Sequence, residues 1–307
     1  MKKTISKSIT IFILLFSLTI PQVSAASGLL IPVAGYSSLT NDSKDKYYAI
    51  IRYYSSLRVP GIMYHKITSD PNEWSVYSIS PQTLREDFQT MKNLGYTPIT
   101  LSEYAEILYG YSCLSNNTAD IDYLYNLVTA HPKPILITAD DGYLGIYTDF
   151  MPLLKEFGFK ANFMIYGEVV DSNHPEYVSW EQITEMQQSG LVEFGNHTYS
   201  LHNYPNSDLI GLYFSQPEFC KNDIELNRAK LEAATGVPCT TFAYPYGIRN
   251  TFSSAIIDQC GYTKILNTDY RTNIIGSGIY NIARVNRDNT TTSQAFFARL
   301  SSLKATV

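Results

Sequence analysis

The chain has 307 residues, of which 45% are hydrophobic and 17% are charged. This composition is typical of a folded globular protein and excludes a disordered or fibrous one. The formal net charge is -5 and the chain has no basic block. Nucleic acid is therefore excluded as the main partner, because nothing in the sequence would supply a set of phosphate contacts.

The first 25 residues have the features of an export signal. Three lysines (Lys2, Lys3 and Lys7) precede an apolar run over residues 9–20, and Val23-Ser24-Ala25 fits the small-x-small rule for signal peptidase. The run is too short for a confident transmembrane helix, although an uncleaved anchor is the alternative. We expect cleavage after residue 25 or 26, no membrane span in the mature chain, and a secreted or cell-surface protein.

The elements expected next are an N-terminal arm and the first strands and helices of a single domain. Residues 26–57 are polar and rich in tyrosine, which predicts a tether or a packed arm, and the domain then covers residues 58–307. Ser80 followed by Pro81 is typical of a helix start. The hydrophobic patterns predict strands over 59–64 and 97–99, helices over 81–94 and 102–108, and a helical insertion over 109–133.

An alternation of strands and helices follows to the end of the chain. We expect strands over 134–139, 161–166, 191–195, 239–244, 262–266 and 280–285, and helices over 147–157, 180–189, 222–235, 252–260 and 292–303. Residues 203–221 read as a polar interruption. Strands separated by helices favour a parallel sheet, and this number of strands is enough to close into a barrel. The predicted fold class is α/β, a distorted (β/α) barrel of mostly parallel strands.

Two adjacent acids, Asp140 and Asp141, directly follow the apolar strand expected over 134–139. Active groups gather where parallel strands end, and two carboxylates at a buried strand end are costly unless a cation or a proton compensates them. A helix N-cap is the structural alternative, since Asp favours that position. One Asp would be enough for a cap, so the second favours a functional site.

Two of the five histidines, His197 and His202, lie within six residues at another predicted strand end. Imidazole pairs at a strand terminus suit first-row transition metals. Two histidines and one carboxylate make three protein ligands and leave a position open for water, which is typical of catalytic zinc sites. The His-Glu-x-x-His pattern of metalloproteases is absent from the sequence.

Two further strand ends carry candidate residues. Pro245-Tyr246-Gly247 predicts a tight turn that can aim a backbone N–H into a site, although such turns are common. His65 follows the first predicted strand and, taken alone, reads as structural. The four cysteines (Cys113, Cys220, Cys239 and Cys260) lack the close spacing of a zinc or redox site, so we expect a structural bridge or buried thiols.

Taken together, these strand ends resemble the polysaccharide deacetylase family, also called the NodB-homology domain or carbohydrate esterase family 4. The resemblance covers roughly residues 60–300, and its most specific parts are Thr138-Ala139-Asp140-Asp141-Gly142 and the segment 197–202, about 55 residues apart. It implies that Asp140 is the general base, that Asp141, His197 and His202 bind the metal, and that the Tyr246 N–H stabilises an oxyanion beside Pro245.

The sequence departs from the commonest form of that family in the spacing of its histidines, in the missing arginine before Pro245, and in having no histidine after His202. The branch typified by poly-β-1,6-N-acetylglucosamine deacetylases is similar on these points. That resemblance implies that His65 is the acid. Arg284 lies where members of the family often carry an arginine near the last strand. Two roles for Arg284 are open: contact with the substrate, or support of the site.

The resemblance implies an exported hydrolase that removes acetyl groups from an N-acetylated, GlcNAc-containing polysaccharide with the help of a divalent metal. Zinc is the expected ion, and cobalt or nickel would also suit the ligands. The alternatives are an O-acetyl xylan esterase or a small amidase that uses the same site, and a catalytically silent carbohydrate-binding relative.

Overall fold

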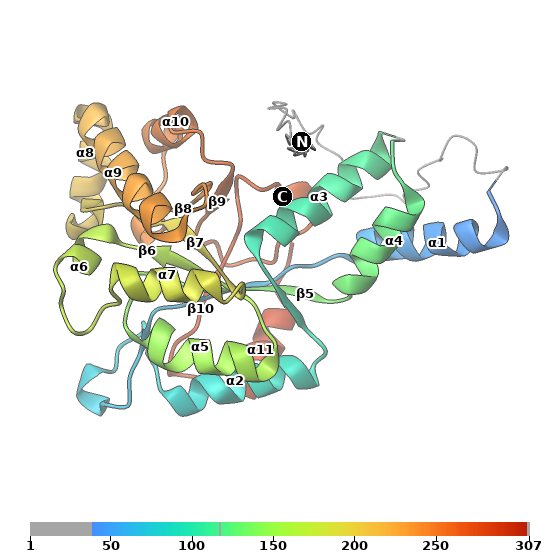
Figure 1. Ribbon diagram of the computed structural model, residues 1–307, viewed down its shortest axis with the longest axis horizontal. Helices are drawn as coiled ribbons and strands as arrows, with labels where there is room; N and C mark the ends of the chain where they lie inside the picture. The colour runs from blue at the N-terminus through green and yellow to red at the C-terminus, as the bar shows by residue number, and fades with distance from the viewer. Residues whose placement is uncertain (1–38, 117, 306–307) are drawn as a thin grey trace, which may run out of the picture.

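The computed structural model describes residues 39–116 and 118–305, and its centre is a curled parallel sheet (Figure 1). Eight strands pair in the order β10-β1-β5-β6-β7-β8-β9, with β4 also pairing with β5, and every ladder between them is parallel. The strands are β1 (Gly61–Tyr64), β4 (Thr97–Ile99), β5 (Pro134–Ala139), β6 (Ala161–Ile165), β7 (Val192–Asn196), β8 (Thr241–Ala243), β9 (Lys264–Leu266) and β10 (Val285–Asn286). A separate two-stranded ladder joins β2 (Lys66–Ile67) and β3 (Ser78–Ile79).

Helices follow most of the strands. They are α1 (Asn41–Ser56), α2 (Pro81–Asn93), α3 (Leu101–Ser115), α4 (Ile121–Ala130), α5 (Met151–Phe157), α6 (Gly167–Asp171), α7 (Trp180–Gln188), α8 (Asn206–Ser215), α9 (Pro217–Thr235), α10 (Thr251–Gln259) and α11 (Ser293–Ser301). Short helical turns lie at η2 (Pro71–Glu73), η3 (Ile146–Phe150), η4 (Leu201–Asn203), η5 (Pro245–Gly247) and η6 (Ile275–Ser277). The Ser80 side chain accepts from the Thr83 N–H at the start of α2, as the sequence predicts.

The strands are buried on both faces and contribute to two cores. Along β5, Ile135 and Ile137 belong to a core with residues of α2, α5, α7, α9, α10 and α11. The residue between them, Leu136, belongs to a second core with residues of α1, α3 and α4. Successive side chains of a strand point to opposite faces, so a continuous apolar run is what a sheet covered on both sides requires.

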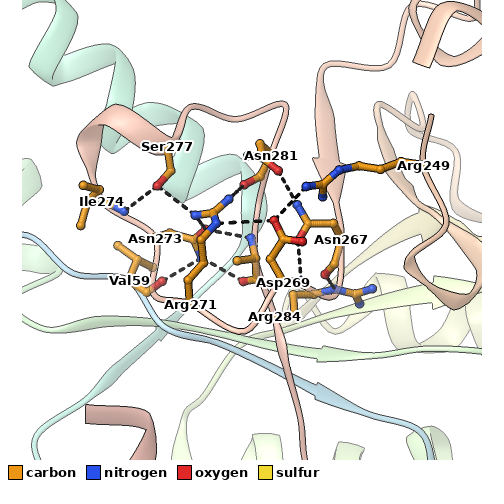
Figure 2. Close-up of polar contacts among 11 residues, drawn as sticks. Val59, Arg249, Asn267, Asp269, Arg271, Asn273, Ile274, Ser277, Asn281 and Arg284 are labelled. Carbon is orange, nitrogen blue, oxygen red and sulfur yellow. Dashed lines mark hydrogen bonds and ion pairs between the residues drawn. The ribbon is translucent and has the colours of Figure 1, made fainter. Parts of the chain in front are cut away.

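The segment before β10 closes the sheet towards a barrel. Ile282 bridges to Leu266 of β9, and three residues later Val285 pairs with Ile62 of β1, so one stretch of chain contacts both edges. The buried side chain of Asn273 fixes this closure, because its amide donates to the carbonyls of Val59 at 2.9 Å and Ala283 at 3.0 Å (Figure 2). The predicted fold, a distorted (β/α) barrel of parallel strands, is confirmed.

Most predicted elements are present, and the clearest error lies between His202 and α9. Residues 203–221, which we expected to be a polar interruption, contain α8 and the first turns of α9. Leu209 and Tyr213 are four residues apart and form the buried face of α8, a short pattern among polar neighbours. The helix expected to end at residue 108 continues to Ser115 within α3.

The remaining predictions about the organisation of the chain have mixed outcomes. The expected arm contains α1, which packs beside α4, while the predicted signal peptide lies outside the described residues. All four cysteines are free thiols, so the bridge we considered is absent. Among the residues described, none of the helices combines the length and the apolar character needed to cross a membrane.

Candidate active site

The predicted site residues meet at the carboxyl end of the sheet. His65 follows β1, Asp140 and Asp141 follow β5, and His197 follows β7. The turn η5, which contains Tyr246, follows β8. Because all these strands are parallel members of one sheet, their ends lie along one rim, and residues up to 181 positions apart in the chain share one site.

Asp141, His197 and His202 form a cluster suited to a metal ion. One ligand atom from each residue lies within 4.8 Å of the other two. Asp141 Oδ1 is 3.5 Å from His197 Nε2 and 3.4 Å from His202 Nε2. That oxygen is buried and has no hydrogen-bond partner in the described structure, a costly arrangement that a cation would relieve.

The protonation states of Asp141 and His202 suit a metal, whereas the pKa of His197 is raised, because Asp141 and Asp140 outweigh the effect of its burial. Burial opposes ionisation of Asp141, but the neighbouring imidazoles of His197, His65 and His202 hold its pKa below the ordinary value. Burial lowers the pKa of His202 to about 4, so this imidazole is neutral at physiological pH. A metal binds a carboxylate and a neutral imidazole.

The two histidines are held in place by contacts that the sequence did not reveal. His197 Nδ1 lies 2.9 Å from the carbonyl oxygen of Ala243, so the opposite nitrogen, Nε2, faces Asp141. The His202 ring stacks on Tyr166 with centroids 5.3 Å apart, and Tyr246 lies against it with centroids 4.4 Å apart. Both imidazoles are thus oriented before any ligand binds.

The loop between the two histidines is anchored to α9. Asp223 of α9 accepts from the N–H groups of Tyr199 at 2.8 Å and Ser200 at 2.7 Å. At the beginning of the loop, Asn196 accepts from the N–H of Thr198, whose φ of 71° lies in the left-handed region. The sequence could not predict that Asp223 anchors this loop, because a single aspartate within a helix does not indicate such a role.

Asp140 is buried and paired with Arg284. The guanidinium Nη1 and Nη2 donate to the two carboxylate oxygens at 2.5 and 2.9 Å, and Nη1 also donates to Thr138 Oγ1 at 3.1 Å. Burial opposes ionisation of Asp140, but Arg284 outweighs it and keeps the pKa below the ordinary value. Arg284 is 1% exposed, so its contacts are those of a residue that supports the site.

His65 lies beside this centre with one ring nitrogen unpartnered. Its Nδ1 is buried without a hydrogen-bond partner among the described residues, and its ring meets the exposed Tyr77 edge-on at 4.9 Å. Burial lowers the His65 pKa, while the negative charges of Asp141 and Asp140 act in the opposite direction. The interaction with both carboxylates places His65 at the same site as the predicted base.

Tyr246 has a strained backbone at the edge of the site. Its φ of 58° is left-handed, within the turn that begins at the buried Pro245. The Tyr246 hydroxyl donates to the His202 carbonyl. Gly247 has a φ of 70°, and a Cβ there would lie 2.0 Å from Thr268 Oγ1, so the turn packs closely on the chain after β9.

A network of polar side chains connects this turn to the base. Arg249, two residues after Gly247, donates to Asp269 at 2.9 Å, and the Asp269 N–H donates to Asn267 Oδ1 at 2.8 Å. The carbonyl of Asn267 in turn accepts from Arg284 Nε at 3.3 Å (Figure 2). Residues 267–269 therefore support both the Tyr246 turn and the Asp140–Arg284 pair.

The chain has recognisable relatives. The polysaccharide deacetylase family model matches residues 128–265. A poly-β-1,6-N-acetyl-D-glucosamine N-deacetylase of Escherichia coli K12 is 23% identical over 233 residues, which cover 66% of this chain and 32% of that protein. The protein of the same name from Staphylococcus aureus N315 is 25% identical over 221 residues, covering 71% of this chain and 70% of its own. The putative polysaccharide deacetylase YxkH of Bacillus subtilis 168 is 26% identical over 199 residues, which cover 64% of this chain and 66% of that protein.

Solved structures share the fold. IcaB from Ammonifex degensii superposes with a TM-score of 0.64 at 23% identity, covering 80% of this chain and 97% of that one. The Streptococcus pyogenes deacetylase PplD superposes with a TM-score of 0.64 at 20% identity, covering 80% of this chain and 98% of that one.

The match to the family model contains Asp140, Asp141, His197, His202 and Tyr246, whereas His65 and Arg284 lie outside it. The chain spans about a third of the length of the Escherichia coli relatives that it matches. The family match, the named relatives and the shared fold agree with one another: this chain carries a polysaccharide deacetylase domain, which the family model matches over residues 128–265.

Proposed function

We propose that the protein is a metal-dependent hydrolase that removes N-acetyl groups from a GlcNAc-containing polysaccharide of the cell wall or the exopolysaccharide. The observation that carries the proposal is the unpartnered Asp141 Oδ1, which faces two imidazoles beside a second, arginine-held carboxylate. The names of the relatives from Escherichia coli and Staphylococcus aureus support poly-β-1,6-linked N-acetylglucosamine as the polymer to test first.

Asp141, His197 and His202 would hold the metal, with zinc as the first choice and cobalt or nickel compatible with the same ligands. When bound, the ion would lower the pKa of a water molecule and polarise the acetyl carbonyl. His197 meets the usual requirement for such a ligand, because its other ring nitrogen lies at a backbone carbonyl.

Asp140 is suited to accept the proton from the attacking water. Its carboxylate lies 3.9 Å from His197 Nε2, next to the metal cluster, and Arg284 keeps it ionised despite burial. Arg284 also fixes both carboxylate oxygens, so the base has a single orientation. A positioned base of this kind contributes about 10²- to 10⁴-fold to the rate of the reaction.

The later steps fall to Tyr246 and His65. The Tyr246 N–H would donate to the oxyanion that forms when water adds to the acetyl carbonyl. His65 would give a proton to the departing nitrogen as the C–N bond breaks. The products are acetate and a glucosamine unit with a free amine. Burial lowers the pKa of His65, and the charges of Asp141 and Asp140 offset only part of this effect.

We further propose that the protein acts outside the cytoplasmic membrane, and that residues 58–307 are its catalytic domain. The basis is the pattern of lysines, apolar run and small residues over 1–25. Detection of a mature N-terminus at residue 26 or 27 in the exported protein would support the leader, and a cytoplasmic protein with an intact N-terminus would contradict it.

The decisive experiment measures acetate release from a panel of polymers, with and without a chelator. The panel contains poly-β-1,6-N-acetylglucosamine, chitin oligomers, peptidoglycan and acetylated xylan. We expect release from N-acetylated polymers that the chelator abolishes and that zinc, cobalt or nickel restores. Release from xylan alone would replace the proposal by an O-acetyl esterase, and no release from any polymer by metal-loaded protein would indicate a silent relative.

A further inference from the structure

A cavity lies at the opposite end of the sheet from the active site. Its volume is about 340 Å³, and its lining includes Pro60 before β1 and Pro134 at the beginning of β5. The six residues of β5 separate the cavity from Asp140, a distance of roughly 20 Å at about 3.3 Å per residue. Figure 1 shows α1 and α4 at this end of β5. The cavity is therefore separate from the deacetylase site.

The lining of this cavity contains cations and no acids. Arg58 and Lys133 contribute to it, and its other residues are neutral. The same imbalance extends to the surrounding sequence: segments 47–60, 131–139 and 293–305 contain Arg52, Arg58, Lys133, Arg299 and Lys304 but neither Asp nor Glu. In a chain whose net charge is -5, this concentration of positive charge is distinctive.

Part of this positive charge offsets the partial negative charge at the carboxyl ends of two helices. Helices α1 and α11 end at Ser56 and Ser301, which both line the cavity. Each helix end carries roughly half a negative charge, and two full cations exceed their sum. Lys133 Nζ donates to the Leu94 carbonyl at 2.8 Å, whereas the exposed Arg58 guanidinium has no hydrogen bond or ion pair within the described part of the chain.

The remaining lining suits a sugar ring. Tyr53 and Tyr96 contribute aromatic rings, and Ser56, Thr272 and Ser301 contribute hydroxyl groups. The Tyr53 hydroxyl is buried and has no hydrogen-bond partner in the described residues. A guanidinium pairs with a carboxylate or a phosphate through two parallel hydrogen bonds. A cavity of this volume is within the range of small-ligand sites.

We propose that this cavity is a second saccharide site, which binds a sugar unit carrying a carboxylate or a phosphate, with Arg58 as its anion-binding residue. The ligand differs from the proposed product of the active site, because a glucosamine unit is cationic and the two cations would repel it. An anionic polymer held here would keep the protein attached while the active site, roughly 20 Å away, acts on the N-acetylated chain.

The test is calorimetric titration of the full chain with trigalacturonate, glucose 1-phosphate and the neutral sugar maltotriose. The Asp141→Asn variant is titrated in parallel, so that binding of a sugar carboxylate at the proposed metal site is not mistaken for binding in the cavity. We expect saturable binding of at least one anionic sugar in both proteins and none of maltotriose. Binding of trigalacturonate would identify a carboxylate as the anion, and binding of glucose 1-phosphate would identify a phosphate.

Arg58→Ala should weaken that binding about tenfold or more, the typical value of a charged, bidentate contact. Arg52→Ala is the matched control, because Arg52 is exposed on the same segment but does not line the cavity. An equal loss in both variants, or no saturable binding of either anion, would overturn the proposal. Acetate release from neutral oligomers should be unchanged in Arg58→Ala, so this result is independent of the deacetylase proposal.

Discussion

Arg284 donates from both terminal nitrogens of its guanidinium to the two oxygens of Asp140, although the residues are 144 positions apart in the chain. The side chains are 0% and 3% exposed, so solvent and salt screen the pair weakly. Arg284 precedes β10, in the segment that closes the barrel, and Asp140 follows β5. The ion pair thus links the proposed base to the segment that closes the barrel.

Replacement of Arg284 by lysine should change the pH dependence of the reaction. Asp140 acts as a base only when ionised, so activity is present above its pKa and is lost as the pH falls through it. Arg284 holds that pKa down. Lysine keeps a charge but cannot pair with both oxygens, so we expect the acidic limb of kcat/KM to move up by about one pH unit, equivalent to about 1.4 kcal/mol of lost interaction.

The measurement is kcat/KM from acetate release between about pH 2.5 and 8, with thermal unfolding to verify that each variant folds. Arg249→Lys is the matched control, since Arg249 belongs to the same polar network but is partly exposed and pairs with Asp269. Its acidic limb should coincide with that of the unaltered protein. A folded Arg284→Lys protein with an unmoved limb would contradict the role that we assign to the pair.

The general position of the site could be predicted from sequence because chemistry and topology coincide there. Asp140 and His197 each follow an apolar strand, and strand ends of a parallel sheet meet at one rim. To predict that these residues lie at this rim, no knowledge of side-chain geometry was needed. The apolar run of β5 similarly predicted a strand covered on both faces.

The partners that orient these residues could not be predicted, because each is a single polar residue far away in the chain. Asp223 lies within a helix whose polar pattern does not distinguish it from its neighbours, yet it accepts two N–H groups of the histidine loop. The buried pair of Asp87 and Arg287 joins residues 200 positions apart beneath Tyr64. Such pairs depend on how the barrel closes, which local periodicity does not encode.

Metal content should separate the two aspartates. Asp141→Asn removes a charged ligand from the cluster and should lower the bound metal and the activity together. Asp140→Asn leaves all three ligands in place, so we expect metal retained with activity reduced about 10²- to 10⁴-fold. Elemental analysis of each purified variant, alongside acetate release, gives both values. Full activity in Asp140→Asn would exclude Asp140 as the base.

Replacement of His65 by alanine should lower kcat and leave the bound metal unchanged. If His65 protonates the departing amine, its loss should reduce kcat about 10²- to 10⁴-fold with little effect on KM, because substrate contacts elsewhere persist. His174→Ala is the control, since His174 is exposed on the loop after α6. Equal turnover in His65→Ala and His174→Ala would show that His65 is a structural residue.

The turn that presents Tyr246 can be tested through Gly247. Alanine at this position would face two difficulties: a φ of 70°, which L residues disfavour by about 1–2 kcal/mol, and a Cβ only 2.0 Å from Thr268 Oγ1. The second forces the turn away from residues 267–269 and moves the Tyr246 N–H from the position we propose for the oxyanion contact. We expect kcat to fall about 10²-fold or more, the usual loss of one such donor.

Gly236→Ala separates the contact from the backbone strain. Gly236 has a φ of 72° at the end of α9, and a Cβ there would meet nothing within 4 Å, so alanine introduces the strain alone. Both variants should unfold at lower temperature, whereas only Gly247→Ala should lose kcat with the metal retained. If the two variants keep the same kcat, the close packing of the turn on Thr268 is dispensable and Tyr246 reaches its position without it.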